Sequence, residues 1–157
     1  MQRILKWIGA WFKGRQTYLQ LKEYSIFEQL GSFDLFLLDE LMHVRKFQPE
    51  EVIFESGYPL EVIYFIQSGE ILLKGNKGNS YDKVLRKGQH LGIFDMFHSL
   101  QRCSTAIAQS QVVVLGISRT DLDDYIKSRP LAGMKILRAI IKELSNIVLT
   151  DNSQDRQ

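Results

Sequence analysis

Between Phe47 and Leu115 the chain alternates short apolar runs with turn residues, and this alternation limits what it can fold into. Each run has two to five residues, mostly of the β-branched, aromatic or other apolar types found in strands. The runs are Val52–Phe54, Val62–Ile66, Ile71–Leu73, Val84–Leu85, Ala106–Ala108 and Val112–Leu115. Turn signals divide them at Ser56–Pro59, Ser68–Gly69, Gly75–Asn79 and Lys87–Gly88. Many short strands joined by regular turns predict a β-sandwich or barrel.

The strand pattern is interrupted by the segment from Gly92 to Arg102. A few helical residues placed between two strands expose unpaired backbone N–H groups at their start. Arg102, at the far end, adds a guanidinium that can bind an oxyanion through two parallel hydrogen bonds. The thiol of Cys103 and the hydroxyl of Ser104 follow directly and offer further polar contacts. The segment therefore predicts a cradle for one phosphate group.

This segment resembles the phosphate-binding cassette of cyclic-nucleotide-binding domains, in which Gly-Glu opens the insert and Arg followed by small residues closes it. Gly92 and Arg102 match that pattern, and stretches 47–57, 62–71 and 85–88 carry the family's glycine spacing. The resemblance covers about residues 24–148. It implies a mainly β, α+β fold: a β-roll flanked by N-terminal and C-terminal helices. The ligand-binding residues it implies are Gly92, Ile93, Phe94, Arg102, Cys103 and Ser104.

The residue after Gly92 departs from the family pattern. The family places there a Glu that accepts a hydrogen bond from the ribose 2′-hydroxyl, whereas this chain has Ile93. A buried hydroxyl without its acceptor costs about 1–3 kcal/mol, so we expect cyclic AMP or cyclic GMP to bind about one to two decades more weakly. Asp95 is the nearest carboxylate, but two residues along a helix turn it about 200° away, so it is a poor substitute. A dinucleotide or another phosphate ligand is compatible with this departure.

Charge is unevenly distributed along the chain of 157 residues, whose formal net charge is +2. Residues 1–22 contain five basic residues and no acidic residue, whereas the remainder has a net charge of −3. This asymmetry indicates that the N-terminal segment meets something anionic or acidic. A content of 45% hydrophobic residues in a chain of this length predicts one core and one domain.

Residues 3–13 predict a basic amphipathic helix that Gly14 ends. At 100° per residue, Ile4, Leu5, Trp7, Ile8, Trp11 and Phe12 lie on one side, opposite Arg3, Lys6 and Lys13. This apolar face fits the interface of a membrane, the chain's own domain or a second copy. Lys6 interrupts the apolar stretch, so a secretory signal is not expected, and the stretch is too short to span a bilayer.

Further helices are expected on both sides of the strands. The first begins near Tyr18, with a break at Gly31-Ser32, and it resembles the family's N-terminal helical bundle. After Ser118, Thr120 is a candidate N-cap and Pro130 opens or breaks a longer helix. That helix carries an apolar seam of Met134, Leu137, Ile141, Leu144 and Val148. The seam pairs with its counterpart in a homodimer or covers the roll. The polar tail from Thr150 is expected to be disordered.

Several functions are not expected. His43, placed on a predicted helix, His90 and His98 have no paired ligand spacing, and no Ser-His-Asp or P-loop pattern occurs, so we expect no metal, no cofactor and no enzyme activity. No helix-turn-helix follows the long C-terminal helix, so DNA binding is not expected. A single cysteine, Cys103, excludes an intramolecular disulfide and fits a reducing cytoplasm.

The sequence predicts three parts: a basic amphipathic segment (1–23), a cyclic-nucleotide-binding-like domain (24–148) and a polar tail (149–157). Our main hypothesis is a cytoplasmic, non-enzymatic regulatory module that senses a cyclic nucleotide or another anionic small molecule and signals through its flanking helices to a protein partner. The alternative is a degenerate domain that binds no nucleotide and serves as a protein-interaction or membrane-peripheral adaptor. In both hypotheses the membrane or partner face is Ile4, Trp7, Ile8, Trp11 and Phe12.

Overall fold

A computed structural model of the chain describes residues 18–75 and 82–154, with side chains as far as Thr150. The chain divides into two compact units. One consists of residues up to Glu40 together with those from Tyr125 onward, and the other is Leu41–Asp124. The predicted amphipathic segment 3–13, with its proposed membrane or partner face, lies outside the described residues.

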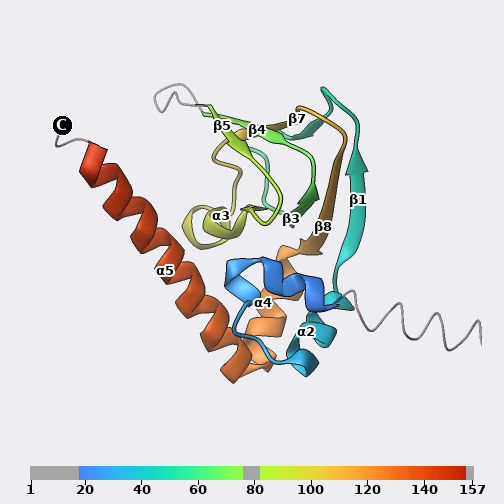
Figure 1. Cartoon of the computed structure of the whole chain (residues 1–157), viewed down its shortest axis with the longest axis vertical. Coiled ribbons are helices and arrows are strands. Elements are labelled where there is room, and N and C mark those ends of the chain that lie inside the picture. The colour runs from blue at the N-terminus through green and yellow to red at the C-terminus, as the bar shows by residue number, and fades with distance from the viewer. Residues whose placement is uncertain (1–17, 76–81, 155–157) are drawn as a thin grey trace, which may run out of the picture. The chain divides into compact units, whose positions relative to one another are not determined.

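The unit Leu41–Asp124 contains two four-stranded antiparallel sheets, drawn in Figure 1. One sheet has the strand order β1-β8-β3-β6 and the other has the order β2-β7-β4-β5. The strands are β1 (His43–Phe47), β2 (Val52–Phe54), β3 (Val62–Ser68), β4 (Ile71–Lys74), β5 (Lys83–Leu85), β6 (His90–Leu91), β7 (Thr105–Ala108) and β8 (Val112–Ser118). The helix α3 (Ile93–His98) connects β6 to β7.

Alternating side chains from the two sheets form the core of this unit. Strand β7 shows the alternation most simply, because Ala106 and Ala108 are fully buried while Thr105 and Ile107 are half-buried. The core cluster is Phe47, Tyr64, Ile66, Ile71, Leu85, Leu91, Ala106, Ala108, Val112 and Val114. The predicted mainly β, α+β fold is therefore confirmed.

All six predicted strands are present, within a few residues of their expected ends. Two strands were missed. Strand β6 has only two residues, and β1 has no apolar run because four of its five residues are exposed. The assignment of His43 to a helix was wrong, since His43 begins β1 and pairs with Gly116 of β8.

The other unit is helical. It contains two 3-10 turns, η1 (Tyr18–Glu23) and η2 (Ser25–Phe27), the helix α2 (Ser32–Asp39) and the long helix α5 (Pro130–Gln154). Helix α4 (Arg119–Ser128) begins in the strand unit and ends in this one. Asp34 joins α2 to the C-terminal helices, because its carboxylate pairs with Arg129 at 2.6 Å and its carbonyl accepts a hydrogen bond from the Tyr125 hydroxyl at 2.9 Å. Ser25 also donates a hydrogen bond to Glu143 of α5.

The expected helix boundaries were partly right. Gly31 is the N-cap of α2, and Pro130 opens α5. Thr120 is not an N-cap, because α4 begins one residue earlier and the Ser118 hydroxyl accepts the backbone N–H of Asp121 at 3.0 Å. The expected disordered tail was also wrong for residues 150–154, since α5 continues to Gln154.

Candidate ligand-binding site

The loop between β2 and β3 holds the backbone of Arg102 in place. The Arg102 N–H donates to the Tyr58 carbonyl at 2.8 Å, and the Arg102 carbonyl accepts from the Gly57 N–H at 2.8 Å. The same two segments are joined again nearby, because the Leu60 N–H donates a hydrogen bond to the Leu100 carbonyl at 2.9 Å. The position of Arg102 is therefore set by main-chain contacts, which do not depend on its side chain.

The Arg102 side chain is buried, with 4% of its surface exposed. Its guanidinium carbon lies 3.8 Å from the centre of the Phe54 ring and 5.7 Å from that of Tyr64. Its Nη2 donates to the Val62 carbonyl at 2.5 Å. Within the described part of the chain, its Nε and Nη1 are buried without a hydrogen-bond partner. A cation held in this way, with two donors free, is suited to receive an anion.

Gly92 lies directly against the guanidinium. It is the N-cap of α3 with φ at +97°, a conformation that glycine adopts without strain. A Cβ atom at this position would lie 2.7 Å from Arg102 Nη1 and 2.9 Å from Leu60 Cδ1. The glycine is therefore required both by its backbone angle and by the close approach of Arg102. The structure brings together the two residues that the sequence predicted to open and close the insert.

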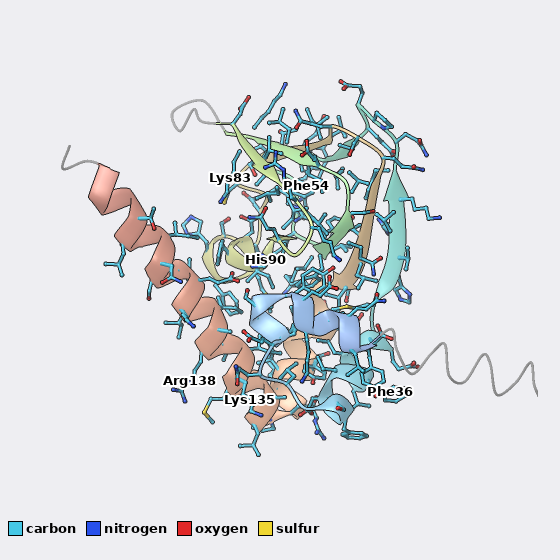
Figure 2. All side chains as sticks on the ribbon, viewed as in Figure 1. Phe36, Phe54, Lys83, His90, Lys135 and Arg138 are labelled. Carbon is cyan, nitrogen blue, oxygen red and sulfur yellow. The ribbon has the colours of Figure 1, made fainter. Side chains whose placement is uncertain are left out.

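A pocket of about 430 Å³ opens beside Arg102. Aromatic rings form part of its wall, with Phe54 and Tyr64 stacked in parallel at 6.5 Å between centroids. The Tyr64 hydroxyl accepts a hydrogen bond from Arg45 Nη1 at 3.3 Å. The lining residues are Arg45, Val52, Ile53, Phe54, Glu55, Tyr58, Pro59, Glu61, Val62, Tyr64 and Arg102. Figure 2 labels Phe54 on this roll.

The other predicted ligand-binding residues do not line this pocket. Ile93 is fully buried, so it offers no surface and no hydrogen-bond acceptor. Phe94 packs its ring against His90, with centroids 5.5 Å apart. Cys103 is exposed, and neither it nor the half-buried Ser104 contributes to the pocket wall. Of the predicted set, Arg102 lines the pocket, and Gly92 contacts Arg102.

The carboxylates of Asp95 and Glu61 partly balance the buried cation of Arg102. Burial lowers the pKa of Arg102, while Tyr64, Asp95 and Glu61 act in the opposite direction. Partial burial of the sulfur raises the pKa of the Cys103 thiol, and the carboxylate of Asp95, which accepts a hydrogen bond from that thiol, raises it further. A raised pKa also keeps Cys103 in the unreactive thiol form.

Sequence reasoning missed the aromatic and acidic members of the pocket. Phe54 and Tyr64 belong to apolar runs, and such runs read as core. Glu55 and Glu61 bracket a turn signal, which reads as a solvated loop. The sequence feature that could have indicated the pocket was the β2–β3 turn. This turn is long enough for residues 57–60 to pair with residues 100–102, which come later in the chain.

Among the residues that the structure describes, no group of three or more His, Cys, Asp or Glu is placed to hold a metal ion. Over the same residues, none of the helices has both the length and the apolar character needed to cross a membrane.

Comparison with known proteins identifies the family to which this fold belongs. The model of the family described as "Cyclic nucleotide-binding domain" matches residues 44–129, which include β2 to β8, all of β1 except His43, the insert and Arg102. This chain belongs to the cyclic nucleotide-binding domain family. The resemblance stated from the glycine spacing and from the insert is therefore confirmed, and the two antiparallel sheets are the β-roll of this family.

Two relatives of this cyclic nucleotide-binding domain protein are considerably longer than the part that this chain matches. A cGMP-dependent protein kinase of Eimeria tenella is 27% identical over 103 residues, which are 66% of this chain and 10% of that protein. A cAMP-dependent protein kinase regulatory subunit of Hypocrea atroviridis is 27% identical over 109 residues, which are 69% of this chain and 23% of that protein. This chain thus spans at most about a quarter of these two relatives.

Solved structures show the same fold. The N-terminal domain of a transcriptional regulator from Streptomyces coelicolor A3(2) superposes with a TM-score of 0.68 at 21% identity, covering 83% of this chain and 93% of that chain. The regulatory subunit of a cAMP-independent protein kinase A from Trypanosoma brucei superposes with a TM-score of 0.72 at 20% identity, covering 95% of this chain and 52% of that one. At these identities the likeness concerns the fold alone.

Proposed function

We propose that this chain is a non-enzymatic regulatory module that binds a cyclic nucleotide or another small phosphate-bearing anion at Arg102. The observation that carries the proposal is the buried guanidinium, 4% exposed, whose Nε and Nη1 have no partner among the described residues. Leaving buried donors unsatisfied costs about 1–3 kcal/mol for each group. An anion that accepts both hydrogen bonds would remove that cost, so the free protein is poised to bind one.

The charges around the pocket favour an anion of low charge. Two arginines, Arg45 and Arg102, share the lining with two carboxylates, Glu55 and Glu61. A polyphosphate would meet both carboxylates at close range, which is unfavourable. A cyclic phosphodiester carries a single negative charge, and the amino and ring N–H groups of a base can donate hydrogen bonds to Glu55 or Glu61. The parallel rings of Phe54 and Tyr64 offer an aromatic surface for such a base.

The output of the module would pass through its helices to a partner. On α5, Met134, Ile141 and Val148 are 52–61% exposed at seven-residue intervals. This spacing suits a helix of a protein partner or of a second copy. Cys103, the single cysteine of the chain, is free, which agrees with a reducing cytoplasmic setting.

Isothermal titration calorimetry tests the proposal most directly. The purified protein is titrated with cyclic AMP, cyclic GMP and cyclic dinucleotides, and the titrations are repeated with Arg102→Ala. Arg86→Ala is the matched control, because Arg86 lies on the same roll in an exposed ion pair with Glu70. We expect micromolar binding of at least one ligand, unchanged in Arg86→Ala and weakened about 100-fold or more in Arg102→Ala. Binding of equal strength in both variants would show that Arg102 is not the anion site.

One observation favours a second candidate function, that of a degenerate domain acting as an adaptor. Ile93 is fully buried, and the Arg102 guanidinium already contacts the Phe54 ring and the Val62 carbonyl. A site filled in this way could hold its shape without a ligand. The same titrations separate the two functions, because the absence of heat with every nucleotide up to millimolar concentration would favour the adaptor. The search would then turn to protein partners and to anionic vesicles.

A further inference from the structure

The helical unit exposes a cluster of apolar side chains on η1 and α2, here called the aromatic patch: Tyr18, Leu19, Phe33 and Phe36. Phe33 is 62% exposed, Phe36 is 43% exposed and Leu19 is 44% exposed. Phe33 and Phe36 are three residues apart on α2, so they share one face of that helix. The rings of Tyr18 and Phe36 meet edge to face at 6.2 Å, and Figure 2 labels Phe36 at α2. Large apolar side chains grouped in this way mark a contact surface.

The chain itself supplies apolar side chains next to this patch. Residues 1–17, which lie outside the described residues, join the structure at Tyr18, which is part of the patch. They carry six large apolar side chains on one predicted helix face, among them Trp7 and Trp11. Residues 13–17 can span at most about 17 Å when extended, and α2 is about 12 Å long. The connection therefore keeps the predicted amphipathic segment within reach of the patch.

Charge decides between this patch and the other exposed apolar surface of the unit. Residues 1–17 contain four basic residues and no acidic one, whereas residues 18–40 contain five acidic residues and one basic. One of the five, Asp34, is already paired with Arg129, whose guanidinium carbon lies 5.2 Å from the centre of the Phe33 ring, so the other four acidic residues supply the attraction. The second surface is a groove on α5 lined by Ile141, Leu144, Ser145, Val148 and Leu149. Lys135, Arg138 and Lys142 are exposed on that helix, and Figure 2 labels the first two. A basic segment is attracted to the acidic region and repelled by the basic helix.

We propose that the segment Arg3–Lys13 packs its apolar side chains on the aromatic patch of the same molecule, with its basic side chains toward the acidic residues of 18–40. Glu40 is well placed for this role, because it is exposed and lies four residues after Phe36, on the same side of α2. The inference is independent of the ligand at Arg102. Of the three partners that the sequence left open for the apolar face of residues 3–13, the proposed one is the chain's own domain and not a membrane or a second copy.

Tryptophan fluorescence of the full chain tests this proposal, because the only two tryptophans of the chain are Trp7 and Trp11. If the segment is docked, their emission is blue-shifted, and quenching by acrylamide is several-fold weaker than for N-acetyl-tryptophanamide. The double variant Phe33→Ser/Phe36→Ser should abolish both effects. Glu40→Lys should weaken them without unfolding the protein, because a lysine near the C-terminus of α2 is compatible with the helix dipole. Raising the salt concentration should act in the same direction as Glu40→Lys.

Ile141→Ser is the matched control, since it removes an exposed apolar side chain from α5 and should leave the fluorescence unchanged. Four results would overturn the proposal: indoles in the wild type as accessible as the free tryptophan derivative, shielding that survives the patch variants, shielding lost in Ile141→Ser, or shielding that grows with protein concentration. Shielding that appears only after vesicles of phosphatidylglycerol are added would also overturn it, in favour of membrane contact. If the double variant fails to fold, Glu40→Lys alone decides.

Discussion

At the scale of single residues, Arg102 is suited to bind an anion but contributes little to the stability of the fold. Its burial costs desolvation energy, and two of its donors gain nothing in return within the described part of the chain. In exchange its guanidinium makes one hydrogen bond, to Val62, and lies beside the rings of Phe54 and Tyr64. A residue that contributes this little to the fold at this cost is more readily explained by a ligand than by packing.

Replacing Arg102 with an apolar side chain of similar length tests that reasoning. We expect Arg102→Met to leave the free energy of unfolding unchanged or to raise it by up to about 2 kcal/mol, because the buried cation is removed and its space is filled. Arg102→Ala should instead lower it by about 2–3 kcal/mol, because a cavity remains. Urea denaturation measures both values. A loss of more than about 2 kcal/mol in Arg102→Met would mean that the guanidinium stabilises the fold.

Tyr125 gives the helical unit a pH dependence whose sign is fixed. Burial, helped by the charge of Asp34, raises the pKa of Tyr125 to about 12. Because this pKa is higher in the folded than in the unfolded chain, the folded state holds its proton longer. The stabilisation of the folded state by protonated Tyr125 is complete below pH 10, the ordinary tyrosine pKa, and is lost as the pH rises toward 12.

Unfolding free energies of the wild type and Tyr125→Phe between pH 8 and pH 12 check this effect. Near pH 8 the wild type should be more stable by about 1 kcal/mol, because the variant lacks the hydrogen bond to the Asp34 carbonyl. Above pH 10 that advantage should shrink and then reverse. Ionisation of Tyr125 stabilises the unfolded wild type, whereas the variant has no ionisable hydroxyl at this position. Parallel curves for the two proteins would contradict the raised pKa.

At the scale of elements, the junction of α4 and α5 depends on a glycine inside a helix. Gly133 lies in the first turn of α5, and a Cβ atom there would clash with the carbonyl oxygen of Ile126 and approach Ile126 Cγ2 to 3.0 Å. Helix propensity alone favours alanine over glycine by about 1 kcal/mol. The close approach of the two helices opposes that preference, because the contact is with backbone, which cannot rotate away.

We therefore expect Gly133→Ala to lower the free energy of unfolding by about 1–3 kcal/mol, despite its higher helix propensity. Gly31→Ala serves as the control, since nothing lies within 4 Å of a Cβ atom placed there, and the loss of a glycine N-cap should cost less than about 1 kcal/mol. Thermal unfolding of the two variants compares them. Equal melting temperatures, or a more stable Gly133→Ala, would show that the helices can separate without cost.

At the scale of the whole molecule, the sequence predicted most of the roll and only a small part of the candidate site. The apolar runs and glycine turns gave six strands, and the Gly92–Arg102 insert gave the cation and the glycine beside it. Strand β1 was missed because an exposed edge strand of mostly polar residues carries no apolar run. The pocket wall was missed because Phe54 and Tyr64 serve both as core and as lining, a distinction that depends on tertiary packing.

The proposed regulatory function also requires that binding at Arg102 be felt outside the strand unit. The chain passes between the two units at Glu40–Leu41 and within α4, at Asp124–Tyr125, so the helices are covalently continuous with the roll on both sides. A ligand can shift the helices only if it binds their alternative states with different affinity. That requirement makes the function measurable without knowing the downstream partner.

Amide hydrogen exchange of the full chain, with and without a saturating nucleotide, makes that measurement. If the module signals through its helices, exchange should change in α2 and α5 as well as around Arg102 and the β2–β3 loop, because local opening of the helices is coupled to ligand binding. The change in the helices should disappear in Arg102→Ala at the same nucleotide concentration. Protection confined to residues 41–124 would leave a functional binding site but no signal, and the role of the helices would then be to bind a partner whether or not the ligand is present.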